Sequence, residues 1–143
     1  MWYNALMIGV LRSPLHALLG SNMIVLTYTG RKTGQLHRVP VNFVRQGDVL
    51  FVTSQRDRVW WRNLRGGAVV SVRLAGSERE AFGEVLEDTA SVAAALAIYL
   101  RGMPQAAKFF QVALDASGGP DPEALARAAE GRVVVKLKLA AGS

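Results

Sequence analysis

Six stretches of the chain are rich in apolar and β-branched residues, in patterns that predict β-strands. They span residues 23–29, 36–45, 49–54, 68–76, 78–87 and 132–139. Polar turns at residues 46–48 and at Gly76-Ser77 join two pairs of these strands as hairpins. Because hairpin connections dominate, we expect a mainly antiparallel sheet that curls into a small barrel and hides its edges.

Apolar positions at helical spacing predict six helices around these strands. They span residues 2–11, 13–20, 58–67, 88–102, 105–114 and 120–131. In the last of them, Asp121 caps the helix, Pro122 fits the first helical position and Gly131 ends it. The chain shows no repeat, linker or low-complexity tract. We therefore expect one α+β domain over residues 1–143, with residues 1–20 as an amphipathic helical segment.

The composition is that of a globular protein, with half of the residues hydrophobic and a fifth charged. There is no cysteine, and the two histidines, His16 and His37, lie far apart, so neither thiol chemistry nor a metal site is expected. No apolar run reaches the ~20 residues that a membrane span needs. Residues 1–11 lack the features of a secretory signal. These observations predict a cytoplasmic protein.

Positive charge is concentrated in one quarter of the chain. Residues 31–65 contain eight cations against two anions, which accounts for the whole net charge of +6. The cations are Arg31, Lys32, Arg38, Arg45, Arg56, Arg58, Arg62 and Arg65. Arginine predominates, and its planar fork suits phosphate and carboxylate groups. We therefore expect an anionic partner for this segment.

The turn between the first two predicted strands has an unusual composition. Gly30 and Gly34 enclose Arg31, Lys32 and Thr33. Glycine lets backbone N–H groups turn outward and lets a ligand approach closely, and successive N–H groups can bind an anion. The segment therefore predicts a phosphate-binding turn, and a plain hairpin turn with solvated charges is the alternative. Its spacing is not that of a P-loop.

A second cluster, residues 54–67, places two adjacent tryptophans among arginines. Neighbouring helical residues point about 100° apart, so one of Trp60 and Trp61 can enter the core while the other lines a cleft. Asn63 falls on roughly the same face as Trp60. Two alternatives stay open: both rings are core residues, or the aromatic and arginine surface stacks single-stranded nucleic acid. The second is the weaker, because the aromatic residues are confined to one segment, and we expect no nucleic-acid partner.

In their order along the chain, these motifs resemble a known family. The motifs are the Gly-Arg-Lys-Thr-Gly turn after a strand, Pro40 in the next strand, Ser54 at the end of a further strand, and then Trp60 and Asn63-Leu64. This order, within residues 23–75, is similar to that of the deazaflavin (coenzyme F420)-dependent nitroreductase and quinone reductase family. That family belongs to the split-barrel, flavin-binding superfamily. The resemblance implies a six-stranded, mainly antiparallel split β-barrel with flanking helices.

The resemblance also implies a function. Family members use reduced F420 to transfer hydride to a quinone, nitroaromatic or enone, so F420 is the expected cofactor and a lipophilic small molecule the expected acceptor. The implied cofactor positions are Gly30, Arg31, Lys32, Thr33, Gly34 and Arg38 for the phosphate and acidic tail, Pro40, Val52, Thr53 and Ser54 along the ring, and Trp60 and Asn63 closing the groove. His37 is an alternative to Arg38. Ser54 is the one catalytic candidate, as a hydrogen-bond donor to ring or substrate.

Several features depart from the family pattern or leave alternatives open. The loop before the tryptophans is short and has Gln55 where lysine is common, so FMN is an alternative cofactor and a non-catalytic flavin or F420 carrier an alternative function. Tyr99 is a substrate-side candidate by type alone, and its helical spacing favours a place in the core. The apolar residues 2–19 either pack on the barrel or make transient membrane contact. Split barrels of this superfamily often pair, which leaves a homodimer open.

Overall fold

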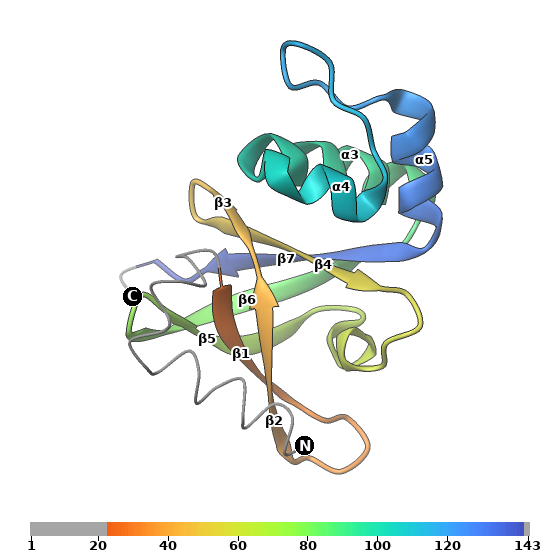
Figure 1. The fold of residues 1–143 in the computed structure, drawn as a ribbon. Coiled ribbons are helices and arrows are strands. Elements are labelled where there is room, and N and C mark those ends of the chain that lie inside the picture. The colour runs from red at the N-terminus through yellow and green to blue at the C-terminus, as the bar shows by residue number, and fades with distance from the viewer. Residues whose placement is uncertain (1–22, 142–143) are drawn as a thin grey trace.

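The computed structural model describes residues 23–141, so the helices predicted at residues 2–11 and 13–20 lie outside the described residues. One antiparallel sheet dominates the fold, with seven strands in the order β2-β1-β5-β6-β7-β4-β3 (Figure 1). The strands are β1 (Met23–Thr29), β2 (Leu36–Asn42), β3 (Val44–Gln46), β4 (Val49–Gln55), β5 (Ala68–Leu74), β6 (Ser77–Leu86) and β7 (Arg132–Leu139). The α+β class and the curled antiparallel sheet are confirmed, but the predicted number of six strands is wrong.

The additional strand arises because the strand predicted at residues 36–45 is divided at Phe43. β2 pairs with β1, and β3 pairs with β4, so the two halves belong to opposite ends of the strand order. One residue therefore carries the chain between the two ends of the curled sheet. Phe43 packs inside the sheet and Val44 packs beneath the helices, so both neighbours are buried. The sequence pattern hides this break because the apolar alternation runs on through Phe43.

Two apolar cores lie on the two faces of the sheet. The inner core fills the curled sheet and includes Leu26, Leu50 and Trp61. The outer core lies between the sheet and the helices and includes Phe51 and Leu96. β4 and β7 contribute alternate residues to both cores, because successive side chains of a strand point to opposite faces. These two strands therefore support both the barrel and the helical layer.

The helical elements after β6 gather on one side of the sheet, whereas the one between β4 and β5 packs against the inner core (Figure 1). The elements are η1 (Trp60–Leu64), α3 (Thr89–Gly102), η2 (Pro104–Ala106), α4 (Ala107–Phe110) and α5 (Pro122–Glu130), of which η1 and η2 are 3₁₀ turns. The predicted cap of α5 is confirmed, since the Asp121 carboxylate accepts from the Ala124 N–H at 3.0 Å. None of the described helices is long and apolar enough to cross a membrane.

Two predicted helices are shorter in the structure. The helix predicted at residues 105–114 ends at Phe110, because Gln111 adopts a left-handed conformation with φ 56°. The helix predicted at residues 58–67 is reduced to η1, and Gly66 and Gly67 follow it with φ of 85° and 97°. Both short elements, together with the end of β4, line the site described next.

Candidate functional site

A cavity of ≈ 660 Å³ opens between the sheet and the helices. We call one side the sheet wall, which β2, β4 and η1 form with Pro40, Thr53, Ser54 and Trp60. We call the other side the helical wall, which the helical layer and the start of β7 form with Tyr99, Met103, Phe109, Phe110 and Arg132. The structure therefore brings four of the predicted cofactor positions together on the sheet wall.

A hydrogen-bonded pair on the sheet wall fixes one tryptophan ring. The indole Nε1 of Trp60 donates to Oγ of Ser54 at 3.1 Å, and that hydroxyl donates to the carbonyl oxygen of Gln55 at 3.1 Å. The Ser54 hydroxyl is thus engaged both as acceptor and as donor, and the residue is 6% exposed. This geometry favours a positioning role for Ser54, and its catalytic role stays a prediction.

The two adjacent tryptophans point in different directions, as the helical spacing predicts. Trp61 is 1% exposed and belongs to the inner core, whereas Trp60 lines the cavity. The guanidinium carbons of Arg62 and Arg65 lie 5.5 Å and 5.1 Å from the centroid of the Trp61 ring, within the range of cation–π contacts. These two arginines of the charged segment therefore pack on a buried ring.

Hydrogen bonds within the turn between β1 and β2 define its shape. The Gly34 N–H donates to the Gly30 carbonyl at 2.8 Å, and the Gly30 N–H donates to the Gln35 carbonyl at 2.8 Å. Gly34 has φ 73°, a conformation that favours glycine. Within the described residues, the backbone N–H groups of Lys32 and Thr33 donate no hydrogen bond, and both residues are exposed. These two N–H groups are therefore available to an anion.

Asn63 connects this turn to the cavity. Its Oδ1 accepts from the N–H of Arg31 at 3.0 Å, and its Nδ2 donates to the carbonyl of Trp60 at 3.1 Å. A second connection is aromatic, because Tyr28 lines the cavity and stacks on His37 with ring centroids 5.4 Å apart. The turn and the sheet wall are therefore neighbours, joined by polar and aromatic contacts.

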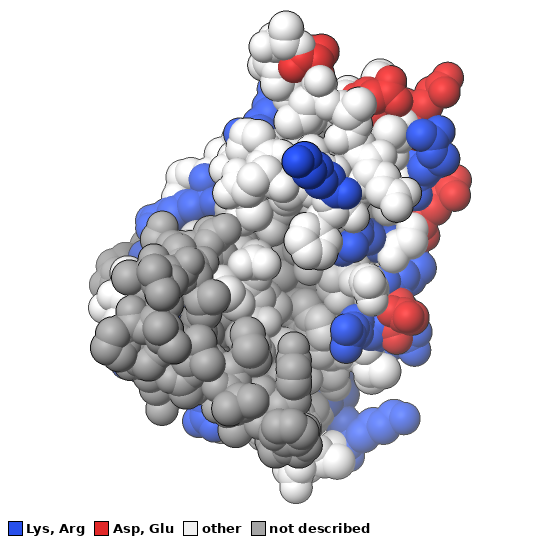
Figure 2. Space-filling model, viewed as in Figure 1, with Lys and Arg blue, Asp and Glu red and all other residues white. Residues whose placement is uncertain are grey.

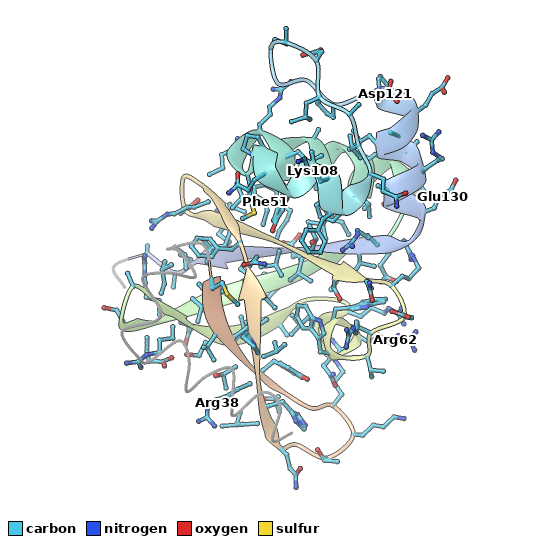
Figure 3. All side chains as sticks on the ribbon, in the orientation of Figure 1. Arg38, Phe51, Arg62, Lys108, Asp121 and Glu130 are labelled. Atoms are coloured by element: carbon cyan, nitrogen blue, oxygen red, sulfur yellow. The ribbon has the colours of Figure 1, made fainter. Side chains whose placement is uncertain are left out.

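Eight of the twelve predicted cofactor positions do not line the cavity: residues 30–34 and Asn63, described above, and Val52 and Arg38. Val52 is fully buried in the inner core, and its side chain does not line the cavity. Arg38 is exposed on β2, and in Figure 3 it lies on the opposite side of the view from Arg62. The pKa of Glu78 is lowered, chiefly by the hydrogen bond from Ser71, with the charge of Arg38 adding to this effect.

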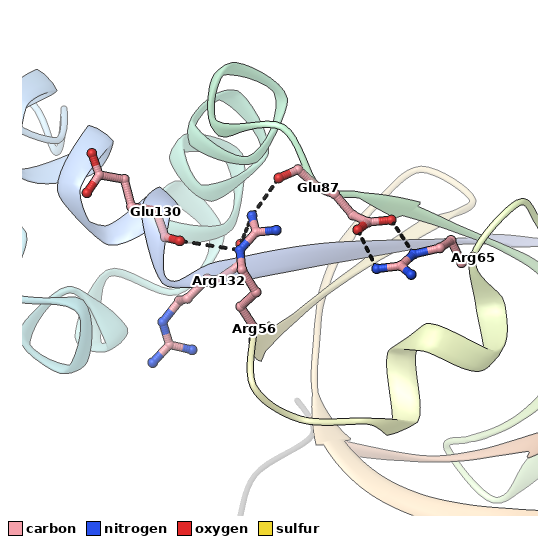
Figure 4. Close-up of polar contacts among 5 residues, drawn as sticks. All are labelled: Arg56, Arg65, Glu87, Glu130 and Arg132. Carbon is pink, nitrogen blue, oxygen red and sulfur yellow. Dashed lines mark hydrogen bonds and ion pairs between the residues drawn. The ribbon is translucent and has the colours of Figure 1, made fainter.

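Polar contacts within the protein engage several cations of residues 31–65. The Arg65 guanidinium donates to both carboxylate oxygens of Glu87, at 2.9 Å and 2.8 Å, and this hydrogen bonding lowers the pKa of that carboxyl (Figure 4). Arg56 donates to the main-chain carbonyls of Glu87, Glu130 and Arg132. Both arginines therefore hold separate segments of the fold together.

Two further cations of the segment bind main-chain oxygens. Arg31 donates through Nη2 to the carbonyl of Arg65, and Arg45 donates through Nε to the carbonyl of Gly47. In Figure 2, acidic residues lie among the cations along the edge at the right of the view. These contacts occupy part of the positive charge of residues 31–65. Of the cations without such a contact, Lys32 lies at the tip of the turn and Arg58 lines the cavity. In the described part of the chain, no three histidine or acidic side chains gather as a metal site.

Sequence reasoning missed several cavity residues, among them Tyr28 and Arg132. Tyr28 lies on the inner face of β1 with its ring centroid 6.3 Å from that of Trp60. Its signal is an inward-facing aromatic residue two positions before a glycine turn. Tyr99 is in the core as predicted, at 3% exposed, but it also lines the cavity. Burial raises the pKa of both tyrosines, so both phenols stay protonated at neutral pH and can donate hydrogen bonds.

Several solved structures share this curled sheet with its helical layer. An F420-H2 dependent reductase (FDR-A) is 16% identical over 82% of this chain and 94% of its own, with a TM-score of 0.53. General Stress Protein 26 from Bacillus anthracis str. Sterne is 17% identical over 87% and 84%, with a TM-score of 0.53. HutZ, the heme storage protein from Vibrio cholerae, is 14% identical over 87% and 85%, with a TM-score of 0.53. The fold therefore defines the chain as a split-barrel-like α+β protein.

Sequence similarity identifies the family more narrowly. Residues 12–109 match the model of the F420H(2)-dependent quinone reductase family, which is well over half of the chain, and the chain belongs to that family. The family resemblance predicted from residues 23–75 is confirmed, and the cofactor that gives the family its name, F420, is the one that the resemblance implied. No curated protein matches the chain.

Proposed function

We propose that this protein binds reduced F420 along the sheet wall and the turn at residues 30–34, and reduces a quinone, nitroaromatic or enone held against the helical wall. Family membership supports the reaction class. The observation that carries the site assignment is the pair of hydrogen bonds by which Asn63 joins the turn to the sheet wall. One extended ligand, with a flat ring at one end and anionic groups at the other, could therefore contact both.

The donors and surfaces of this region suit such a ligand. Pro40 and Trp60 offer apolar surface to a flat ring, and Thr53 adds a polar group beside them. At the turn, the N–H groups of Lys32 and Thr33 and the Lys32 ammonium suit a phosphate. The residues present thus fit both the ring and the acidic tail of the cofactor.

The cofactor, when bound, supplies a hydride, and the protein supplies binding and orientation. Ser54 holds the indole of Trp60, which gives the sheet wall a fixed shape. The protonated phenols of Tyr28 and Tyr99 can donate hydrogen bonds to an acceptor oxygen in the cavity. These roles need no nucleophile and no general-base pair, in keeping with a chain that has no cysteine.

A side-by-side titration with F420 and FMN, followed by tryptophan fluorescence at physiological salt, tests the proposal. We expect tight F420 binding and weak FMN binding. Lys32→Ala should weaken F420 binding about tenfold, because it removes a charge-assisted contact to the phosphate. Lys138→Ala is the matched control, since Lys138 is also exposed but lies on β7 and does not line the cavity.

Each outcome of the titration has a distinct meaning. Binding of neither cofactor would contradict the proposal. A preference for FMN would indicate that the site holds a flavin and uses flavin chemistry. F420 binding without reduction of any quinone, nitroaromatic or enone would favour a non-catalytic carrier. Unchanged F420 affinity in both Lys32→Ala and Gly34→Ala would leave residues 30–34 as a charged hairpin turn.

A further inference from the structure

One cation of the helical wall has no part in the proposed cofactor site. Arg132 is the first residue of β7, pairs with Gln55 of β4, and lines the cavity together with it. The Arg132 guanidinium carbon lies 4.3 Å from the centroid of the Phe110 ring, which holds the half-buried cation on an aromatic face. Arg132 and Phe110 lie beyond residues 12–109, so the family match assigns neither of them a role.

Arg132 has no carboxylate partner within the described residues. The two ion pairs found there involve other arginines. Figure 4 shows the Arg132 guanidinium pointing away from the carboxylates of both Glu130 and Glu87. Burial lowers the pKa of Arg132, although a guanidinium stays charged at neutral pH. A half-buried charge without a counter-ion is poorly compensated, so an anion entering from the cavity would stabilise it.

The main chain of Arg132 is held in place by another arginine. Arg56 donates through Nη2 to the Arg132 carbonyl at 3.0 Å and through Nε to the Glu130 carbonyl at 3.3 Å. The same guanidinium also donates to the Glu87 carbonyl just after β6 (Figure 4). The start of β7 is therefore fixed to two other segments. Arg132 is presented to the cavity from an ordered backbone, which reduces the cost of ordering it on binding.

The surroundings of this guanidinium define the chemistry of its ligand. Phe110 and Tyr99 meet edge to face beside it, and Phe109 and Val59, 85% and 65% exposed, add apolar surface to the cavity. We propose that Arg132 binds an oxyanion on an aromatic acceptor, so that acidic aromatic compounds are preferred over neutral ones of the same shape. The identification of this ligand as the acceptor rests on the proposed function, whereas the binding itself does not.

Calorimetric titration of the full chain without cofactor tests the proposal with two probes of one ring system. 2-Naphthoate is an anion at neutral pH, and 2-naphthamide is its neutral counterpart. We expect naphthoate to bind about tenfold more tightly than naphthamide, because a charge-assisted hydrogen bond to Arg132 is added. Arg132→Met should abolish this preference and leave naphthamide binding unchanged, since methionine keeps apolar contact with Phe110. Arg132→Lys should retain part of the preference.

Arg127→Met is the matched control, because Arg127 is exposed on α5 and does not line the cavity. It should keep the full preference for naphthoate. Thermal unfolding checks that each variant folds. If Arg132→Met does not fold, Arg132→Lys is used in its place, and its preference for naphthoate should be smaller than that of the wild type. The proposal is overturned if the wild type does not prefer naphthoate, or if the preference survives in a folded Arg132→Met.

An F420 titration of Arg132→Met distinguishes the acceptor from the cofactor as the source of the anion. We expect unchanged F420 affinity, because the acidic tail is assigned to the turn at residues 30–34. A tenfold loss would assign Arg132 to that tail and overturn the acceptor assignment. Because the naphthoate titration contains no cofactor, a failure of F420 binding would contradict the proposed function and leave the naphthoate result intact.

Discussion

The two walls of the cavity are built in different ways. The sheet wall consists of strand residues in fixed register and of η1, which hydrogen bonds of Ser54 and Asn63 tie to β4 and to the turn between β1 and β2. The helical wall is assembled from the end of α3, a four-residue helix and the first residue of β7, and apolar packing holds it together. Strand pairing and side-chain hydrogen bonds therefore fix the sheet wall, whereas apolar packing holds the helical part of the other wall. If the proposed function is correct, the cofactor lies against the rigid sheet wall, and the acceptor lies against a helical wall whose shape depends on side-chain packing.

The largest expected effect separates the two tryptophans of η1. Trp61→Ala should lower the free energy of unfolding by about 3–5 kcal/mol, because it empties a fully buried site in the inner core. Trp60→Ala should cost roughly 1–2 kcal/mol, since that ring borders the cavity and loses one hydrogen bond. Urea denaturation measures both values. Trp60→Ala should weaken F420 binding more than Trp61→Ala does. Equal losses of stability in the two variants would contradict the assignment of Trp61 to the core and of Trp60 to the cavity.

A smaller effect tests the packing of the helical wall. A Cβ at Gly102 of α3 would overlap Cγ1 of Val44, so Gly102→Ala should destabilise the fold by about 1–3 kcal/mol despite the better helix propensity of alanine. Gly131→Ala is the matched control, because a Cβ at Gly131 would meet no atom within 4 Å. Thermal unfolding of both variants decides the matter. If Gly102→Ala is as stable as the control, the Val44 side chain can move aside without a measurable loss of unfolding free energy.

Asn63→Ala tests the link between the turn and the sheet wall. The variant should lose about 1 kcal/mol of stability, because the Arg31 N–H and the Trp60 carbonyl each lose a partner. F420 affinity should fall several-fold as the turn is released, and naphthoate binding at the helical wall should be unchanged. Parallel calorimetric titrations measure both affinities. A parallel loss of both would show that the two walls respond as one unit.

The same contrast explains how far the sequence could predict the site. Strand residues and short motifs form the sheet wall, so the family resemblance, which depends on the order of such motifs along the chain, was enough to find Pro40, Ser54 and Trp60. Phe110 and Arg132 are 22 positions apart in the chain, and only tertiary packing brings them into cation–π contact. No local sequence pattern predicts such a pair.

Two features of the backbone could not be predicted from the sequence for similar reasons. The division of the strand at Phe43 depends on which neighbours each half pairs with, and apolar alternation carries no information on pairing. The end of α4 depends on a left-handed conformation at Gln111, a residue type that gives no sign of it. Long-range contacts of this kind must be read from the structure.

The smallest expected effect concerns the ion pair that ties η1 to the end of β6. The pKa of Glu87 is lowered, chiefly by the hydrogen bond from Arg65. A carboxyl with a lowered folded pKa stabilises the fold above its unfolded pKa of about 4.3, and this contribution is lost as the pH falls through the folded value. Because the Arg65 side chain is 52% exposed, Glu87→Gln should cost no more than about 1 kcal/mol at neutral pH.

Urea denaturation in dilute buffer measures this difference as a function of pH. The stability gap between wild type and Glu87→Gln should begin to narrow below about pH 4, where the unpaired carboxyl of the unfolded chain is protonated, and should close as the pH falls through the lowered folded pKa. Added salt should narrow the gap at neutral pH. Glu84→Gln is the matched control, since Glu84 lies nearby on β6, is exposed, and takes part in neither ion pair of the described residues. A gap that persists unchanged in acid would assign the effect to packing, and the tie between η1 and β6 would then not depend on charge.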